Sequence, residues 1–160
     1  MQVGESRHSS TTRISPANTP SSFTDKLLAK DVSKQRLTQD QADAARALLQ
    51  PTTSIDDLAS ADFVIEAVPE IPQLKFDIFA KLAQVCPKHA ILATNTSSIS
   101  ITRIAAATTG GKPTDTTNSS RVVSTHFMNP VPVQKGVEII SGLQTSAETL
   151  TSTHCQQSDG

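Results

Sequence analysis

The sequence predicts an α/β protein built on a parallel sheet. Short apolar runs of strand length alternate along the chain with segments whose apolar residues recur at helical spacing. The clearest case is residues 62–94, where an apolar strand (62–68), a helical segment (73–85) and a second apolar strand (90–94) follow one another. A strand–helix–strand unit of this kind is normally a right-handed crossover between parallel strands. We therefore expect these two strands to share one sheet.

The first 23 residues are expected to be disordered. This segment is rich in serine and threonine, contains Glu5 as its only acidic residue and shows no periodicity that would bury one face. Its composition leaves two explanations open. It resembles an organelle-targeting segment through Arg7 and Arg13, and it also fits a non-native start of the gene product.

Two helices are expected next. Apolar residues recur from Leu27 to Leu37 and predict the first helix. Thr38 and Gln41 then form the pattern of a capping box, in which each side chain accepts a hydrogen bond from the other residue's backbone N–H group. The second helix is predicted to run to Leu49, because a proline at position 51 disfavours helical backbone just before it.

The rest of the chain completes one domain. Beyond the second apolar strand the sequence predicts a short helix, a polar loop, two short strands and a polar tail: residues 99–107, 108–120, 122–126, 137–140 and 151–160. The expected organisation is thus a disordered segment (1–23), one domain (24–150) and a tail (151–160).

Composition excludes several classes of function. The 160 residues carry a formal net charge of -1 without a basic stripe, so we expect no nucleic-acid partner. No apolar run approaches the roughly 18 residues that cross a bilayer, so we expect a soluble protein with no membrane partner. Cys86 and Cys155 are the only cysteines and provide neither a disulfide framework nor a cysteine-rich metal site, so we expect no metal.

Polar residues follow the predicted strands. Glu70 comes just after the first strand, residues 95–98 (NTSS) after the second, and residues 126–130 (HFMNP) close the third. In an open parallel sheet the ligand crevice lies beyond the carboxyl ends of the strands, which makes these positions candidates for a nucleotide and substrate site. The alternative is that they only form turns, for which Asn, Ser and Pro are equally suited.

His126 and Glu138 form the sharpest candidate pair. Glu138 lies within the apolar run 137–140, where a carboxylate is costly to bury unless a donor or cation meets it. If the two strands are neighbours, Glu138 can accept from one ring nitrogen of His126 and leave the other nitrogen free as a base. In the alternative, the histidine hydrogen-bonds the turn and the glutamate faces solvent.

Four ordered motifs resemble the second half of the NAD-binding domain of the 3-hydroxyacyl-CoA dehydrogenases, and above all the 3-hydroxybutyryl-CoA dehydrogenases. They are ADFVIEAVPE at 61–70, LKFDIFAKL at 74–82, ATNTSSISITRIAAAT at 93–108 and HFMNPVPVQKGVEII at 126–140. The helical stretch after residue 24 is similar to the insertion that these enzymes carry before the VIEA strand. The resemblance covers about residues 24–150 and implies part of a Rossmann-type sheet.

The resemblance implies NAD-dependent oxidation of a 3-hydroxyacyl-CoA to the 3-oxoacyl-CoA. His126 would be the general base for the 3-hydroxyl group, Glu138 would orient it, and Ser97 would hydrogen-bond the reacting oxygen. An acyl-CoA would be the substrate. The implied cofactor contacts are Glu70 and Lys75 with the ribose and diphosphate part of NAD, Ser97 beside the cofactor, and Asn129 near the nicotinamide.

The sequence also departs from this family. Its six glycines stand at positions 4, 110, 111, 136, 142 and 160, so no G-x-G-x-x-G loop can be drawn. We therefore expect a partial Rossmann-type parallel sheet that lacks its first strands and glycine-rich loop. The helical domain that makes these enzymes homodimers is also expected to be absent. Two hypotheses follow: one part of the dehydrogenase, or a truncated, non-catalytic remnant that binds dinucleotide or a full-length partner weakly.

Overall fold

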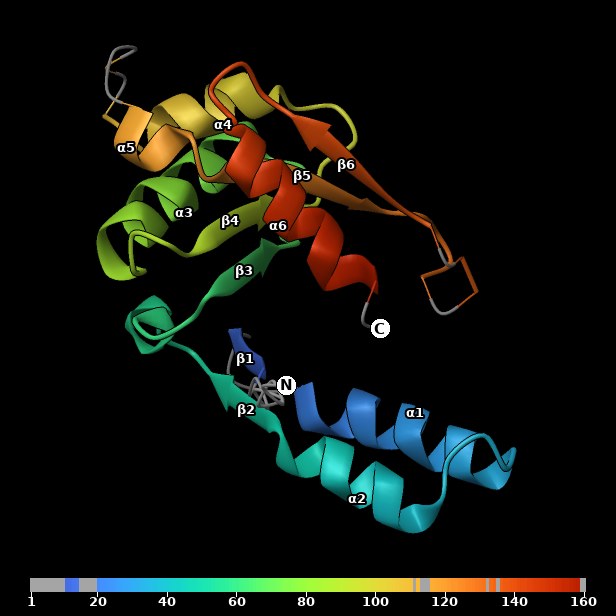
Figure 1. Ribbon diagram of the computed structural model, residues 1–160. Helices are drawn as coiled ribbons and strands as arrows, with labels where there is room; N and C mark the ends of the chain where they lie inside the picture. The colour runs from blue at the N-terminus through green and yellow to red at the C-terminus, as the bar shows by residue number, and fades with distance from the viewer. Residues whose placement is uncertain are drawn as a thin grey trace, which may run out of the picture. The chain divides into compact units, whose positions relative to one another are not determined.

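The structure is a computed structural model, and it describes residues 11–14, 20–110, 112, 116–131, 133–134 and 136–158. The chain divides into two compact units, Met1–Asp57 and Leu58–Gly160 (Figure 1). Each unit is described here by itself.

The first unit contains a helical hairpin and a small parallel sheet. Its elements are β1 (Thr11–Ile14), α1 (Pro20–Ser33), α2 (Gln39–Ala47) and β2 (Leu49–Thr52), and a 3₁₀ helix (Ile55–Leu58) follows them. The predicted capping box is confirmed, because Thr38 Oγ1 accepts from the Gln41 N–H at 3.2 Å and Gln41 Oε1 accepts from the Thr38 N–H at 2.9 Å. These two bonds satisfy N–H groups that the first turn of a helix leaves without partners.

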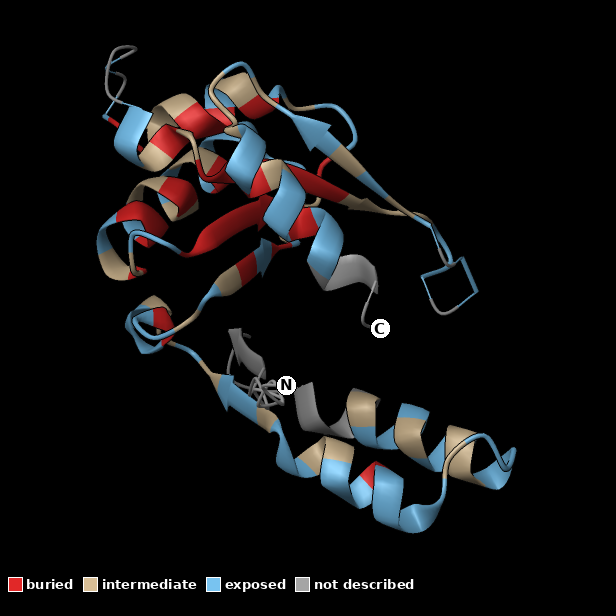
Figure 2. Cartoon of the chain, viewed as in Figure 1, coloured by how far each residue is buried: buried red, intermediate tan, exposed pale blue. Residues whose placement is uncertain are grey.

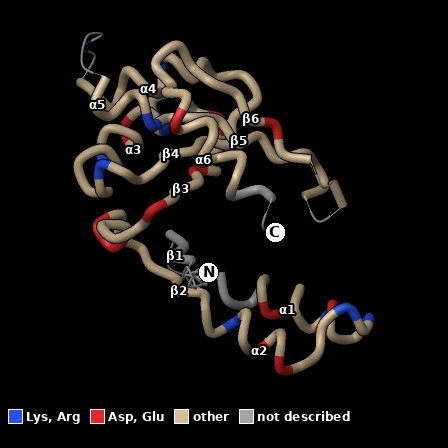
Figure 3. The backbone as a smooth tube through the Cα atoms, in the orientation of Figure 1, with Lys and Arg blue, Asp and Glu red and all other residues tan. Residues whose placement is uncertain are grey.

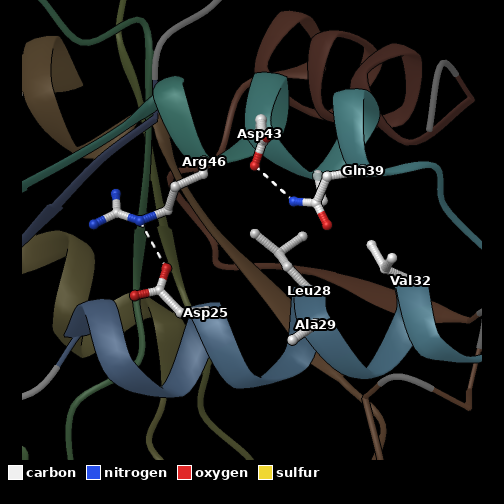
Figure 4. Close-up of a pocket in the computed structure, with 8 residues that line it drawn as sticks. Asp25, Leu28, Ala29, Val32, Gln39, Asp43 and Arg46 are labelled. Carbon is white, nitrogen blue, oxygen red and sulfur yellow. Dashed lines mark hydrogen bonds and ion pairs between the residues drawn. The ribbon is translucent and has the colours of Figure 1, made fainter.

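Helices α1 and α2 enclose a shallow apolar groove with a charged rim. Leu28 and Val32 lie between the two helices, and an ion pair from Arg46 Nε to Asp25 Oδ1 at 2.8 Å closes one end (Figure 4). Ala42 is buried, whereas most of the described side chains on these helices are exposed or half-buried (Figure 2). The hairpin therefore contributes little apolar burial of its own.

The expected disordered segment, residues 1–23, lies largely outside the described residues. Within it the structure describes only 11–14 and 20–23, whose backbone belongs to β1 and to the start of α1. Strand β1 pairs in parallel with β2 in the register Thr11↔Leu49 to Ile14↔Thr52. For the four residues of β1 the structure differs from the expectation, because backbone pairing needs no amphipathic pattern in the sequence.

The second unit is built on a four-stranded sheet in the order β3-β4-β5-β6. The strands are β3 (Phe63–Glu66), β4 (Ile91–Thr94), β5 (Val122–Phe127) and β6 (Val137–Ser141). Strands β3, β4 and β5 are parallel, which confirms the predicted crossover through α3 (Pro72–Val85). Strand β6 runs antiparallel to β5, so the sheet is mixed rather than wholly parallel.

The core lies on the central strands. All four residues of β4 are buried, as a strand covered on both faces requires (Figure 2). Ile91, Ala93 and Val123 form one apolar cluster with Leu150 of helix α6 (Ala147–Ser158), which crosses one face of the sheet (Figure 1). Helix α3 packs against α4 (Ile101–Ala107), and a short helix α5 (Thr116–Ser119) lies within the expected polar loop.

The C-terminal segment differs from the expected polar tail. Helix α6 continues to Ser158, so residues 151–158 are helical, and residues 159–160 lie outside the described part of the chain. Thr153 is buried with its hydroxyl donating to the Thr149 carbonyl at 2.7 Å. A threonine whose hydroxyl donates to a carbonyl of its own helix can be buried in a core. A high content of polar residues therefore did not exclude a helix in this segment.

Candidate functional site

The carboxyl ends of β3, β4 and β5 meet at one edge of the sheet, because these three strands are parallel neighbours. The segments that leave this edge are residues 67–71, 95–100 and 128–131. All the candidate site residues except Glu138 and Lys75 lie in these segments or at the end of β5. The two exceptions reach them from β6 and from α3.

A buried ion pair lies beneath this edge. Glu66, the last residue of β3, and Lys75 of α3 have side chains that are 2% and 0% exposed. Lys75 Nζ donates to Glu66 Oε1 at 2.8 Å and to Oε2 at 3.0 Å, and Thr94 Oγ1 donates to Oε2 at 2.7 Å. Two buried charges that face each other with their remaining hydrogen-bonding sites satisfied offset much of their desolvation cost.

Lys75, an expected cofactor contact, is buried beneath this edge. Its ammonium group has no exposed surface and donates, beyond Glu66, to the carbonyls of Val68 at 3.2 Å and Asn95 at 3.3 Å. Its Nζ also lies 3.6 Å from Glu70 Oε2. The ammonium thus contacts oxygens of Glu66, Val68, Asn95 and Glu70.

Glu70 joins the loop after β3 to the loop after β4. Its Oε1 accepts from the Thr96 hydroxyl, from the Ser98 hydroxyl at 3.0 Å, and from the backbone N–H groups of Ser97 at 3.2 Å and Ser98 at 3.1 Å. Burial raises the pKa of this carboxyl, but the hydrogen bonds from Thr96 and Ser98, together with the charge of Lys75, outweigh it and lower the pKa to about 2. Glu70 is therefore a fixed anion with an exposed face.

Ser97 and Asn129 both lie exposed at this edge. The Ser97 backbone is held by Glu70, and its hydroxyl makes no hydrogen bond with any other residue that the structure describes. The Asn129 side chain likewise has no hydrogen-bond partner within the described ranges, and a cis peptide bond joins it to Pro130. Both side chains therefore present polar groups that are available to a ligand.

The structure brings His126 and Glu138 together, which is one of the two arrangements that the residues left open and the one that the family resemblance implies. They are direct partners in the antiparallel pairing of β5 and β6, and His126 Nδ1 lies 2.9 Å from Glu138 Oε2. The histidine side chain is 26% exposed and the glutamate side chain 56% exposed. The carboxylate acceptor favours the ring tautomer with the proton on Nδ1, which leaves the Nε2 lone pair for a substrate proton.

Two residues of this edge, Asn95 and Glu66, were given no individual role by the sequence analysis. Asn95 Oδ1 accepts from the Phe127 N–H at 3.3 Å, which ties the loop after β4 to the strand end that carries His126. Glu66 anchors Lys75, as described above. The signal for Glu66 was present in the sequence, because it is a lone carboxylate in the apolar strand DFVIEAV, the same pattern that drew attention to Glu138.

Charges of both signs are interspersed along the described chain rather than gathered on one element (Figure 3). Among the described residues, no group of three or more His, Cys, Asp or Glu side chains is placed to hold a metal ion. Within the same ranges, no helix combines the length and apolar character that crossing a membrane requires.

Comparison of the sequence with known proteins identifies relatives of this chain. Residues 15–157 match the family model of the 3-hydroxyacyl-CoA dehydrogenase NAD binding domain. The chain is 46% identical over 119 residues to 3-hydroxyadipyl-CoA dehydrogenase of Escherichia coli K12, which covers 74% of this chain and 23% of that protein. It is 43% identical over 124 residues to a probable 3-hydroxybutyryl-CoA dehydrogenase of Bacillus subtilis, covering 78% of this chain and 40% of that one.

The fold is shared with solved structures. The crystal structure of 3-hydroxybutyryl-CoA dehydrogenase from Escherichia coli K12 superposes with a TM-score of 0.77 at 42% identity, covering 85% of this chain and 27% of that chain. The present chain thus spans less than half the length of each of these three proteins. The α/β class and the Rossmann-type relationship are confirmed.

Proposed function

This chain belongs to the family of the 3-hydroxyacyl-CoA dehydrogenase NAD binding domain, and we propose that it takes part in the NAD-dependent oxidation of a 3-hydroxyacyl-CoA to the 3-oxoacyl-CoA. The observation that carries the proposal is the hydrogen bond between His126 Nδ1 and Glu138 Oε2 at 2.9 Å, at the edge of the sheet where nucleotide folds bind their ligands. The names of the relatives favour a short hydroxyacyl thioester such as 3-hydroxybutyryl-CoA.

The residues at this edge fit the nicotinamide and ribose end of the cofactor. Glu70 is an ionised carboxylate with an exposed face, and such a group accepts hydrogen bonds from ribose hydroxyls. Ser97, next to Glu70, and Asn129, in the segment after β5, offer further exposed polar groups at this edge. Lys75 would contribute through Glu70, since its ammonium has no exposed surface. NAD, when bound, would supply the acceptor for the hydride that leaves the substrate carbon.

The protein groups would perform the proton chemistry. His126 Nε2 would take the proton of the 3-hydroxyl group, and the imidazolium that results would be stabilised by the Glu138 carboxylate at Nδ1. The Ser97 hydroxyl would donate to the reacting oxygen and align it with the histidine. General base catalysis of this kind contributes roughly 10²- to 10⁴-fold to a rate.

A second candidate function is weak dinucleotide binding without turnover. The observation that favours it is the distribution of the six glycines, none of which forms the G-x-G-x-x-G loop on which a dinucleotide diphosphate normally rests. The partnership with an acyl-CoA and with a second copy of the chain would then be lost or weak. We propose the same domain organisation in both cases, with residues 24–150 as the dehydrogenase-type domain.

One set of measurements separates the two candidates. Formation of NADH is followed by absorbance with 3-hydroxybutyryl-CoA and NAD, for the wild-type chain, His126→Gln and the matched control His89→Gln. His89 is exposed and pairs with Asp62, away from the candidate site residues. Turnover that is lost only in His126→Gln supports the dehydrogenase. Binding of NADH without turnover supports the second candidate, and a chain that binds no NADH contradicts both.

A further inference from the structure

We propose that Glu66 is a positioning residue for the cofactor end of this site, and that it acts through Lys75 on the Glu70 carboxylate and on the loop after β4. The inference rests on the proposed function, because Glu70 is the proposed ribose ligand. It adds a residue that itself touches neither cofactor nor substrate.

Glu66 cannot serve as a ligand, because its carboxylate is fully occupied. The side chain is 2% exposed, and both its oxygens accept from Lys75 Nζ, at 2.8 and 3.0 Å. The Val68 N–H donates to Oε1 at 2.6 Å and the Thr94 hydroxyl donates to Oε2 at 2.7 Å. Any influence of Glu66 on a ligand must therefore pass through the groups that it binds.

Lys75 is the link between Glu66 and the ligand-facing loops. Its ammonium donates to the Val68 carbonyl in the loop after β3 and to the Asn95 carbonyl in the loop after β4. Asn95 in turn accepts from the Phe127 N–H at the end of β5. One buried cation thus holds the carboxyl ends of neighbouring strands at a defined spacing, and Glu66 holds that cation in place.

The balance of charge explains why Glu66 affects Glu70. Two carboxylates share one ammonium, so the cluster of Glu66, Lys75 and Glu70 carries one net negative charge. Glu66 is buried and cannot be hydrated, whereas Glu70 is partly exposed, so the ammonium pairs closely with Glu66 and lies 3.6 Å from Glu70 Oε2. The net negative charge therefore resides on the exposed carboxylate, where Oε2 has only the longer ion pair with Lys75 and can accept from a hydroxyl donor.

Removal of the Glu66 charge should move the Lys75 ammonium towards Glu70. In Glu66→Gln the ammonium loses its buried counter-charge, and Glu70 becomes its only nearby anion. Lys75 would then compete with a ribose hydroxyl for Glu70 Oε2. The double variant Glu66→Gln with Lys75→Met has neither buried charge, so no uncompensated ion is left in the interior. Glu70 nevertheless loses its ion pair with Lys75.

The test measures two properties of the 160-residue chain. The dissociation constant of NADH is obtained by fluorescence titration, and the backbone amide resonances of Ser97, Ser98 and Phe127 are recorded by NMR without ligand. Thermal unfolding reports whether each variant is folded. We expect both Glu66→Gln and the double variant to raise the dissociation constant about tenfold, the equivalent of one charged hydrogen bond, and to displace the three amide resonances.

Asp77→Asn is the matched control, because it removes one negative charge from an exposed position of α3, the helix that carries Lys75, where the Asp77 side chain accepts from Gln73 Nε2 at 2.8 Å. It should leave both readouts unchanged. A purely structural role for Glu66 predicts that the folded double variant binds NADH as the wild type does and keeps its amide resonances, and that result would overturn the proposal.

The two readouts also separate this inference from the proposed function. If the wild-type chain binds no NADH, the proposed function fails, and the amide resonances alone then decide whether Glu66 positions the loop. If the double variant does not fold, Thr94→Val removes only the hydroxyl that binds Glu66 Oε2. Displaced resonances in that variant would support the proposal, and unchanged ones would contradict it.

Discussion

His126 and Glu138 face each other directly across the antiparallel pairing of β5 and β6, with 2.9 Å between His126 Nδ1 and Glu138 Oε2. The two residues are twelve positions apart in the sequence, and the register of two neighbouring strands places them on the same face. Directly opposed side chains of an antiparallel pair are close enough for such a contact without any movement of the backbone. The dyad therefore depends on the sheet rather than on a flexible loop.

This contact predicts the tautomer of His126. In the neutral ring the proton should lie on Nδ1, because only that arrangement donates to the Glu138 carboxylate. Nitrogen chemical shifts of the histidine ring should show this tautomer in the wild-type chain, and Glu138→Ala should shift the population towards the tautomer protonated on Nε2. Asp62→Asn, which removes the carboxylate beside His89, should leave the His126 signals as they are. Identical spectra for wild type and Glu138→Ala would contradict the assignment.

The low pKa of Glu70 predicts a pH dependence of stability. Its pKa is lowered from 4.5 to about 2 in the folded chain, so the folded state favours the ionised form. The resulting contribution to stability is present above about pH 4.5 and is lost as the pH falls towards 2. We expect the free energy of unfolding, measured by urea titration at several pH values, to fall less steeply in Glu70→Gln than in the wild type over this range.

A second variant checks the cause of that pH dependence. Thr96→Val removes the hydroxyl donor to Glu70 Oε1 and should reduce the slope only in part, because the Ser98 donors remain. Equal slopes in wild type and Glu70→Gln would show that the carboxyl makes no such contribution.

The buried central strand predicts a large stability difference between two leucines. Leu92 of β4 is 0% exposed, whereas Leu143 is 92% exposed. Leu92→Ala should lower the free energy of unfolding by about 2–5 kcal/mol, because it removes apolar contacts and leaves a cavity. Leu143→Ala, the matched control, should change it by less than about 0.5 kcal/mol. Similar losses in the two variants, measured by urea unfolding, would show that β4 is not the centre of the core.

The capping box predicts the local stability of α2. Thr38→Ala removes the acceptor for the Gln41 N–H and should lower the opening free energy of this helix by about 1 kcal/mol. Thr38→Ser keeps an oxygen at the same place and should retain most of that stability. Native-state hydrogen exchange of the amides in the first turn provides the measurement. Equal exchange rates in the two variants would mean that the side chain does not cap the helix.

The sequence by itself determined the parts of this protein that depend on local pattern. The strands at β3 and β4, the helix between them and the capping box follow from periodicity and local motifs, and four ordered motifs carry the resemblance that indicated the family. For His126 and Glu138 the residues alone left two arrangements open, and the resemblance to the family implied the pair.

Only the tertiary structure decided what depends on burial and on the direction of strands. It placed β6 antiparallel to β5, extended α6 beyond residue 151 and paired the buried ammonium of Lys75 with Glu66. Which of two carboxylates binds an ammonium depends on which is less hydrated, and hydration is set by how much chain packs over each group. That quantity belongs to the folded molecule, and no local pattern of residues contains it.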